Sequence, residues 1–271
     1  MHNAARREER AVLPAGSDIA RKDRKKKKTM KRILALLLVL LIPATALGAT
    51  LKEDVGPVRY ESNVETVQFG RYDQDNHPEN GQEPIEWIVL EERDGKRLLF
   101  ARDLLERKRF NETYGNNNWE GCTLRTWLNT EFMQKAFTAE ERAAILLTHV
   151  DNSKAQDNPA FRNTNSGNDT DDYIFLISYK ECVTYFPETP SRRAAPTDHA
   201  IANGAIADKS YKINGRGCGF WWLRSIGPHP WRASMAYAPG TMRYTYFTRD
   251  FVGVRPMMWV DISKLPENAK K

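Results

Sequence analysis

The sequence predicts an α+β fold, with antiparallel strands at both ends of the folded region and two to four short helices between them. Three observations predict this class. Alternating apolar segments joined by a tight-turn signal come first, apolar positions with helical spacing follow, and short aromatic-rich strands close the chain. No internal repeat is apparent, so the pattern predicts one domain and not an array of stacked units.

Alternation and one turn predict the first strands. Residues 64–69 alternate between apolar and polar side chains, which is typical of a strand with one buried face. Residues 85–91 and 96–101 are also strand-like, and the Asp-Gly pair between them is a strong signal for a two-residue hairpin turn. Residues 72–84 are rich in Asp, Asn, Pro and Gly, which predicts an exposed loop.

Helical spacing and capping patterns mark the middle of the chain. Apolar residues recur at three- and four-residue intervals over residues 123–137, which predicts an amphipathic helix. Residues 138–141 and 178–181 each place Glu three positions after Thr or Ser, the capping-box pattern of a helix start. We expect the first of these two helices to run to about residue 147 and the second to end before Pro187.

Strands are expected again after the helices. Residues 151–172 hold few apolar side chains, which predicts a long loop before an apolar strand at residues 173–177. Four later strands, separated by Gly-Pro, Pro-Gly and Arg-Asp pairs, are expected to form an antiparallel meander: residues 219–224, 233–238, 242–247 and 253–261.

The positive charge of the chain is concentrated in one segment. The chain holds 41 Lys and Arg against 35 Asp and Glu, a net charge of +6, but residues 1–32 alone hold 12 basic and 4 acidic side chains. The rest of the chain is therefore close to neutral. Nucleic-acid binding needs cations on the folded surface, so the composition does not favour a nucleic-acid partner.

The basic segment leads into an apolar run that is typical of a secretory signal peptide. Residues 33–42 are continuously apolar and are followed by small residues that offer cleavage after Ala46 or Gly48. A run of ten is shorter than the roughly 20 residues that cross a bilayer.

We therefore interpret residues 30–48 as a signal peptide. Residues 1–29 are then a basic extension from an over-called start, or a real long n-region. Residues 49–271 form one exported domain, secreted or periplasmic, without stable membrane insertion after cleavage. Nothing in the sequence sets an oligomeric state.

The three cysteines match no metal or redox motif. Cys122, Cys182 and Cys218 are far apart in the sequence, and none belongs to a C-x-x-C pair. We expect isolated, mostly buried side chains, with one disulfide plus a free thiol as the alternative.

Five strings in the chain are distinctive. They are Phe69-Gly70-x-Tyr72-x-Gln74, Pro84-Ile85-x-Trp87, Leu124-Arg125-x-Trp127-Leu128-Asn129, Trp221-Trp222-Leu223-Arg224-Ser225 and Gly253-Val254-Arg255-Pro256-x-x-Trp259. With these strings the chain resembles the bacterial family called domain of unknown function 6273, over about residues 64–262. The closing pattern is also similar to the C-type-lectin-like fold of formylglycine-generating enzymes and of retroelement-diversified binding proteins, so the resemblance implies that fold.

The departures from these relatives bear on function. Formylglycine-generating enzymes hold copper with a close cysteine pair, whereas Cys182 and Cys218 are distant in this sequence. Calcium-dependent lectins carry Glu-Pro-Asn or Gln-Pro-Asp together with Trp-Asn-Asp strings, and none occurs here. The resemblance therefore implies neither the copper-dependent oxidation of formylglycine-generating enzymes nor a calcium-bridged sugar site.

Aromatic and arginine side chains of the later strands are the candidate ligand-binding residues. Aromatic faces and guanidinium groups together suit a sugar or a peptide, and residues two apart on a strand share a face. The alternative is that half of these residues fill the core and do not contact a ligand. The candidates are Trp231, Arg232, Tyr237, Tyr244, Tyr246 and Arg249.

Other large side chains are expected to be structural. Arg224 and Arg255 lie within apolar strands and need carbonyl or carboxylate partners, such as Asp261 or a loop acid. We expect them to tie the sheet to loops; ligand clamps are the alternative. The tryptophans assigned to the core are Trp87, Trp127, Trp221, Trp222 and Trp259.

One loop carries oxygen ligands that suit calcium. Asp169, Asp171 and Asp172 lie close in sequence, but the spacing and distal Glu of an EF-hand are missing. Ordinary turn chemistry is favoured, with a calcium site as the alternative, and no other cofactor is expected.

The sequence favours an exported, non-catalytic binding module that recognises a glycan or a protein. The five histidines stand in no recognisable catalytic setting. The alternatives are an exported enzyme related to formylglycine-generating enzymes with altered chemistry at Cys218 or Cys182, and a structural cell-surface module.

Overall fold

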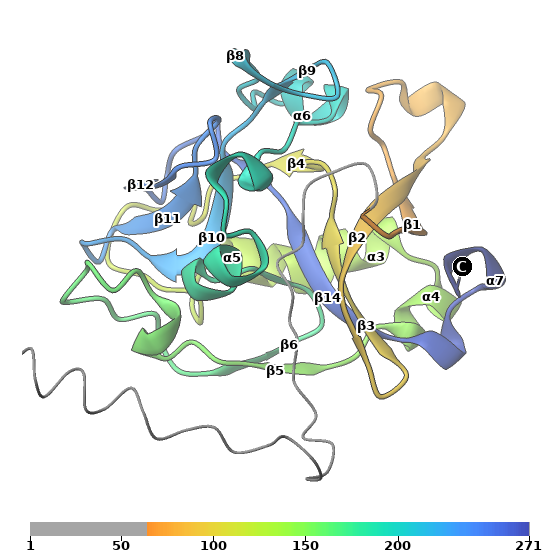
Figure 1. The fold of residues 1–271 in the computed structure, drawn as a ribbon, viewed down its shortest axis with the longest axis horizontal. Helices are drawn as coiled ribbons and strands as arrows, with labels where there is room; N and C mark the ends of the chain where they lie inside the picture. The colour runs from red at the N-terminus through yellow and green to blue at the C-terminus, as the bar shows by residue number, and fades with distance from the viewer. Residues whose placement is uncertain (1–63, 271) are drawn as a thin grey trace, which may run out of the picture. The chain divides into compact units, whose positions relative to one another are not determined.

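The computed structural model describes residues 64–270. These residues belong to one compact unit, an α+β fold in which two five-stranded sheets share a core (Figure 1). The predicted extension and signal peptide, residues 1–29 and 30–48, lie outside the described residues.

The first sheet is antiparallel throughout. Its strand order is β1 (Thr66–Tyr72), β2 (Glu83–Arg93), β3 (Lys96–Ala101), β14 (Pro256–Asp261) and β7 (Phe175–Leu176). The predicted hairpin joins β2 to β3. Both Asp94 and Gly95 have positive φ, 50° and 71°, as the favoured two-residue hairpin turn requires.

The second sheet is mixed. Its order is β12 (Met242–Tyr246), β11 (Arg232–Ala236), β10 (Trp221–Ile226), β13 (Gly253–Val254) and β4 (Glu106–Arg107). Strands β10 and β13 are parallel, and the other pairs are antiparallel. Two small antiparallel pairs complete the strands: β5 (Thr148–Val150) with β6 (Thr170–Asp172), and β8 (Asp208–Ile213) with β9 (Arg216–Cys218).

The helices are short and most were expected. The predicted helix at residues 123–137 consists of α2 (Thr123–Trp127), a π-helical segment (Leu128–Phe132) and α3 (Met133–Ala136). Both capping boxes are confirmed, at α4 (Ala139–Ala144) and α5 (Tyr179–Tyr185). The remaining helices are α6 (Asp198–Ala202), α7 (Glu267–Lys270) and 3-10 turns at Pro78–Asn80, Lys154–Gln156, Thr189–Arg192 and Ile262–Lys264.

Two elements are shorter than predicted because their backbone groups bond to residues outside the element. Helix α4 ends at Ala144 and not near residue 147, since Ile145 is extended and bridges Val260. The strand predicted at residues 173–177 pairs only over β7. The Asn129 side-chain oxygen accepts hydrogen bonds from the amides of Tyr173 and Ile174 at 2.8 and 3.1 Å, so these amides are unavailable to a sheet.

The predicted four-strand meander is wrong at its last strand. The segment 253–261 divides at Arg255 into β13 and β14, and the chain passes from the second sheet to the first. Arg255 is fully buried there; its Nε donates to the Ala101 carbonyl at 2.7 Å, and its guanidinium lies over the rings of Phe100 and Trp221. These contacts join the two sheets at the crossing.

The other residues expected to be structural lie in or against the core. Trp87, Trp221 and Trp222 are buried, and each indole N–H donates to a backbone carbonyl. Trp127 is 8% exposed, and Trp259 is half-buried beneath the Arg93 guanidinium.

Arg224 is 2% exposed and makes a two-pronged ion pair with Glu181 at the start of α5. It also donates to the carbonyls of Leu176 and Asp151. Its acidic partner is therefore the capping-box Glu and not Asp261, whose carboxylate binds Ser263 and Lys264.

Candidate functional site

Four of the six candidate ligand-binding residues meet on the outer strand of the second sheet. Arg232 of β11 lies opposite Tyr246 of β12, and Tyr244 is two residues away on the same face. Arg249 follows β12 in the turn where its amide donates to the Tyr246 carbonyl. We call Arg232, Tyr244, Tyr246 and Arg249, together with the neighbouring Tyr114 and Phe161, the aromatic–arginine surface.

The guanidinium of Arg232 is held between two tyrosine rings. Its carbon lies 4.6 Å from the ring centre of Tyr246 and 5.3 Å from that of Tyr244. One of its terminal nitrogens donates to the Tyr246 hydroxyl at 3.1 Å. The Arg249 guanidinium lies 5.4 Å from the Tyr246 ring centre, so two cations contact one tyrosine.

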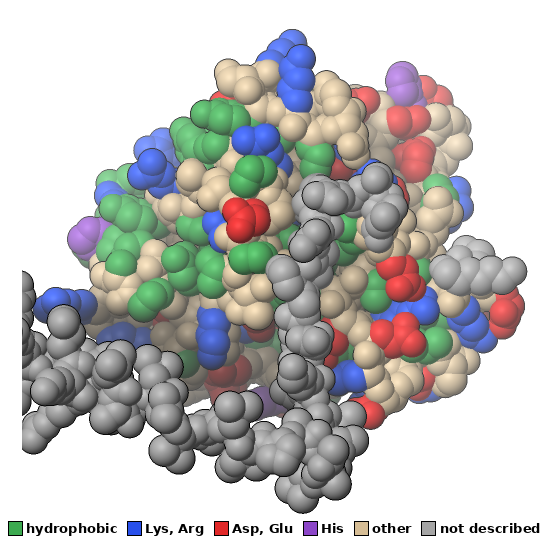
Figure 2. Space-filling model, viewed as in Figure 1, with side chains coloured by type: hydrophobic (Ala, Val, Ile, Leu, Met, Phe, Trp, Pro, Cys, Tyr) green, Lys and Arg blue, Asp and Glu red, His purple; other side chains and the backbone are tan. Residues whose placement is uncertain are grey.

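The positive charge of this surface is not balanced by acids. Among the described residues, no carboxylate lies within ion-pair distance of Arg232, Arg243 or Arg249. Asp250, next to Arg249, pairs with Arg109 instead. The Nε of Arg232 is buried without a hydrogen-bond partner in the described part of the chain. Figure 2 shows hydrophobic and basic side chains gathered over β11 and β12.

Two further rings, an exposed one and a partly buried one, extend the surface. Tyr114 is 68% exposed and its ring centre is 6.3 Å from that of Tyr246. Phe161, from the long loop, meets the Tyr244 ring edge-on at 5.4 Å. Neither was a candidate from sequence. Both lie in polar segments, where an isolated aromatic residue was the only signal that sequence offered.

The other two candidates lie elsewhere. Tyr237 follows β11 at its opposite end and packs on Phe220, with ring centres 4.3 Å apart. Trp231 stacks flat on His229 at 5.1 Å. The six residues predicted as one platform therefore divide into one cluster of four and two separate aromatic contacts.

The acidic loop is engaged in hydrogen bonds. Asp172 is buried, with one oxygen accepting from the Arg125 guanidinium at 2.6 Å and the other from the Trp119 indole at 3.0 Å. Asp169 and Asp171 flank the exposed His149 ring at 3.3 and 3.1 Å. The hydrogen bond that the ring donates to Asp171, assisted by the charge of Asp169, raises the pKa of His149 above its ordinary value.

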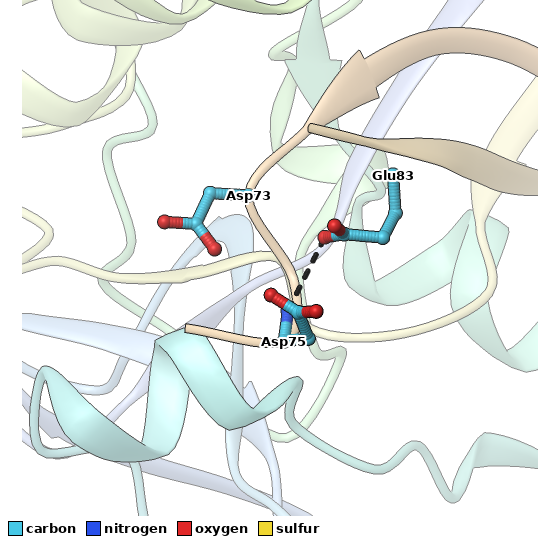
Figure 3. A group of neighbouring side chains, drawn as sticks. All are labelled: Asp73, Asp75 and Glu83. Carbon is cyan, nitrogen blue, oxygen red and sulfur yellow. Dashed lines mark hydrogen bonds between the residues drawn. The ribbon is translucent and has the colours of Figure 1, made fainter. Parts of the chain in front are cut away.

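A different acidic group has carboxylate oxygens close enough to share a cation. Within the described residues it consists of Asp73, Asp75 and Glu83, at the turn between β1 and β2 (Figure 3). Each carboxylate already serves the turn: Glu83 accepts from the amides of Gln74 and Asp75, as Figure 3 shows in part, Asp75 from His77, and Asp73 from Asn76. Local turn chemistry accounts for this group.

A buried polar network lies behind that turn. The His199 ring stands between two carboxylates, with Nε2 at 3.2 Å from Glu106 and Nδ1 at 3.4 Å from Asp73. The Tyr72 hydroxyl donates to Glu106 at 2.9 Å; burial and then the Glu106 charge raise the pKa of Tyr72. This network ties the end of β1 to β4 and α6. Beside it is a shallow cavity of about 290 Å³ lined mostly by polar and acidic side chains.

The three cysteines are buried and unpaired. Burial raises the pKa of Cys122 and of Cys182 to about 12, and that of Cys218 also above its ordinary value. No histidine is a hydrogen-bond partner of a thiol among the described residues. The disulfide alternative does not hold in this structure.

One sequence family matches this chain. No helix among the described residues is both long and apolar enough to traverse a bilayer. No curated protein and no solved structure matches the chain. The sequence profile described as "Domain of unknown function (DUF6273)" matches residues 94–262, which hold β10 to β14 and the whole aromatic–arginine surface. The chain therefore belongs to the DUF6273 family.

Proposed function

We propose that this protein is an exported, non-catalytic binding module that holds a glycan or a protein ligand on the aromatic–arginine surface. Export rests on the signal-peptide pattern of residues 30–48. A C-type-lectin-like version of the α+β fold is part of the proposal, and its support is the Trp-Leu-Arg-Ser and Gly-Val-Arg-Pro strings of β10 and β13.

The observation that carries the proposal is the unbalanced charge at Arg232. The guanidinium lies over the rings of Tyr244 and Tyr246 and donates to the Tyr246 hydroxyl, so it is oriented. No carboxylate among the described residues lies within ion-pair distance of it, and an oriented guanidinium without an acidic partner suits an anionic ligand. The ligand is therefore expected to carry a carboxylate, sulfate or phosphate.

The same geometry disfavours an uncharged sugar. Sugar stacking needs a free aromatic face, but the Tyr246 ring is contacted by both Arg232 and Arg249. Tyr114 is the ring with most free area. Anion recognition by arginine, with tyrosine rings as support, fits these contacts better than stacking alone.

No observation favours the cysteine-based enzyme alternative. A nucleophilic or copper-binding thiol has to be accessible as the thiolate, whereas burial raises the pKa of Cys182 to about 12. The shared acidic group and the His199 network are accounted for by turn and inter-element hydrogen bonds.

The experiment is a binding screen on the full chain with anionic probes: polygalacturonate, chondroitin sulfate and poly-glutamate. We expect at least one to bind and the double variant Arg232→Gln, Arg249→Gln to weaken it about tenfold or more. The matched control is Arg216→Gln, which removes an exposed arginine of β9 that pairs with Asp103. Binding that is equally strong in the double variant would refute the proposed surface.

A further inference from the structure

Strand β12 is the outer strand of the second sheet, and its free edge lies beside the aromatic–arginine surface. Edge strands present unpaired backbone groups to solvent and are templates for pairing with another chain. Whether this edge is open depends on which backbone groups of β12 the neighbouring β11 already uses.

The register of β11 and β12 shows which groups are used. Hydrogen bonds join Phe247 N–H to the Trp231 carbonyl at one end of the pair and Tyr237 N–H to the Thr241 carbonyl at the other. Hydrogen-bonded and non-hydrogen-bonded pairs alternate along an antiparallel ladder, so counting from either end assigns the same residues of β12 to hydrogen bonds with β11. Thr245 and Arg243 pair inward with β11.

The alternate residues of β12 therefore point their backbone groups away from the sheet. These are Met242, Tyr244 and Tyr246. Of their outward groups, the Tyr246 carbonyl accepts from the Arg249 amide, and the others have no hydrogen-bond partner in the described part of the chain. The edge is thus open at Met242, at the 40%-exposed Tyr244 and at the Tyr246 N–H, whereas the Tyr246 carbonyl is already used.

Both faces of this open edge carry positive charge. The Arg232 guanidinium crosses from β11 to lie over the rings of Tyr244 and Tyr246. The exposed Arg243 projects from the opposite face of β12, because side chains alternate along a strand. Neither arginine has a carboxylate partner among the described residues.

We propose that an extended acidic peptide segment of a partner protein docks here as a sixth strand of the second sheet. Its backbone pairs with the outward groups of Tyr244 and its alternate neighbours, and its Glu or Asp side chains meet Arg232 on one face or Arg243 on the other. This inference rests on the proposed function and specifies the ligand class and binding mode. The open backbone edge favours a peptide over an anionic glycan, which has no comparable row of donors and acceptors.

The probe is a synthetic peptide of about eight residues with alternating Val and Glu, a length that matches a typical strand. Fluorescence anisotropy with the full chain measures its affinity. We expect binding, an about tenfold loss with Arg232→Gln, and loss with the same peptide methylated at alternate backbone nitrogens. The basic residues 1–32 also attract acidic peptides, so only the part of binding that Arg232→Gln removes is counted.

A protein variant tests the edge directly. Tyr244→Pro removes the outward N–H at the centre of β12, and Tyr244→Ala removes the same ring but keeps the N–H. Proline is tolerated at the free side of an edge strand, so the folded state is retained and is checked by circular dichroism. We expect Tyr244→Pro to bind the peptide about tenfold more weakly than Tyr244→Ala. The methylated peptide gives the same test without any change in the protein.

The outcomes separate the two proposals. Binding of chondroitin sulfate that needs Arg232, together with no peptide binding at about 1 mM, would leave the aromatic–arginine surface as a binding site but overturn strand addition. Peptide binding that is insensitive to backbone methylation and to Tyr244→Pro would also overturn it. Binding of every probe that is unchanged by Arg232→Gln would overturn the proposed function itself.

Discussion

At the scale of single residues, the structure separates polar groups that serve the fold from those that face a ligand. Glu83, Asp172 and Arg224 have their hydrogen bonds satisfied largely by neighbouring backbone and side chains. Arg232 differs, because its oriented guanidinium has aromatic neighbours and one hydroxyl acceptor but no acid among the described residues.

The thiols give the first prediction at this scale. Burial raises the pKa of Cys122 and Cys182 to about 12, so the thiolate fraction at about pH 8 is on the order of 10⁻⁴. A chromogenic disulfide reagent should therefore leave all three cysteines of the folded protein unmodified for hours and modify all three after denaturation. Rapid modification of Cys182 or Cys218 in the folded protein would revive the cysteine-based alternative.

The titration of His149 gives the second prediction at the residue scale. Its hydrogen bond to Asp171 and the Asp169 charge favour the protonated ring, so its pKa lies above the ordinary 6.5. A raised pKa stabilises the folded loop below pH 6.5, and that contribution is lost as pH rises through the folded-state value. Proton NMR titration should show the His149 pKa falling in Asp171→Asn, whereas Asp208→Asn leaves it unchanged. An unchanged pKa in Asp171→Asn would contradict the geometry.

At the scale of elements, local sequence signals predicted what local interactions decide. The two capping boxes, the Asp-Gly hairpin and the apolar spacing of residues 123–137 all depend on neighbours within a few residues, and all appear in the structure. The early end of α4 depends on a distant strand, because the extended Ile145 bridges Val260. No local pattern encodes that contact, so the end of this helix could not be predicted; the π-helical segment at Leu128–Phe132 was not predicted either.

The capping box of α5 gives a prediction for this scale. Burial alone would raise the pKa of Glu181, but the Arg224 charge and hydrogen bonds from Arg224 and Ser178 outweigh it and hold the pKa below its ordinary value of 4.5. A lowered folded-state pKa contributes stability above pH 4.5 that is lost as pH falls further. Glu181→Gln should cost about 3 kcal/mol at neutral pH, because Arg224 stays buried without its acid.

The matched control is Glu141→Gln in the other capping box. Glu141 has no buried arginine partner in the described part of the chain, and Gln retains the capping geometry, so the cost should stay below about 1 kcal/mol. Urea unfolding at several pH values measures both. The stability difference between Glu181→Gln and the unaltered chain should narrow below pH 4.5; a difference that is constant with pH would contradict the ion pair's role.

At the scale of the whole molecule, the crossing at Arg255 joins the two sheets. The sequence marks Arg255 as a buried arginine that ties the fold together, but the change of sheet at this residue is a tertiary feature. It follows from the Ala101 carbonyl and the rings of Phe100 and Trp221, which lie far away in the chain. The division of the predicted ligand platform has a simpler cause, since Arg232 begins β11 and Tyr237 follows its last residue.

This crossing predicts cooperative unfolding. Both sheets should unfold in one transition, seen alike by tryptophan fluorescence and far-ultraviolet circular dichroism. Arg255→Lys keeps the charge but loses the planar stack and the Nε donor, so it should cost about 2–4 kcal/mol. Arg93→Lys, an exposed arginine over Trp259, should cost less than about 1 kcal/mol. Two separate transitions in the unaltered chain would contradict the shared core.

The central claim is that Arg232, held between Tyr244 and Tyr246, binds an anionic ligand. The most direct test is the affinity of the full chain for the alternating Val and Glu peptide and for chondroitin sulfate, in Arg232→Gln and in Arg216→Gln. We expect the affinity of whichever probe binds to fall about tenfold in Arg232→Gln and to stay unchanged in Arg216→Gln. Equal affinities in the two variants would contradict it.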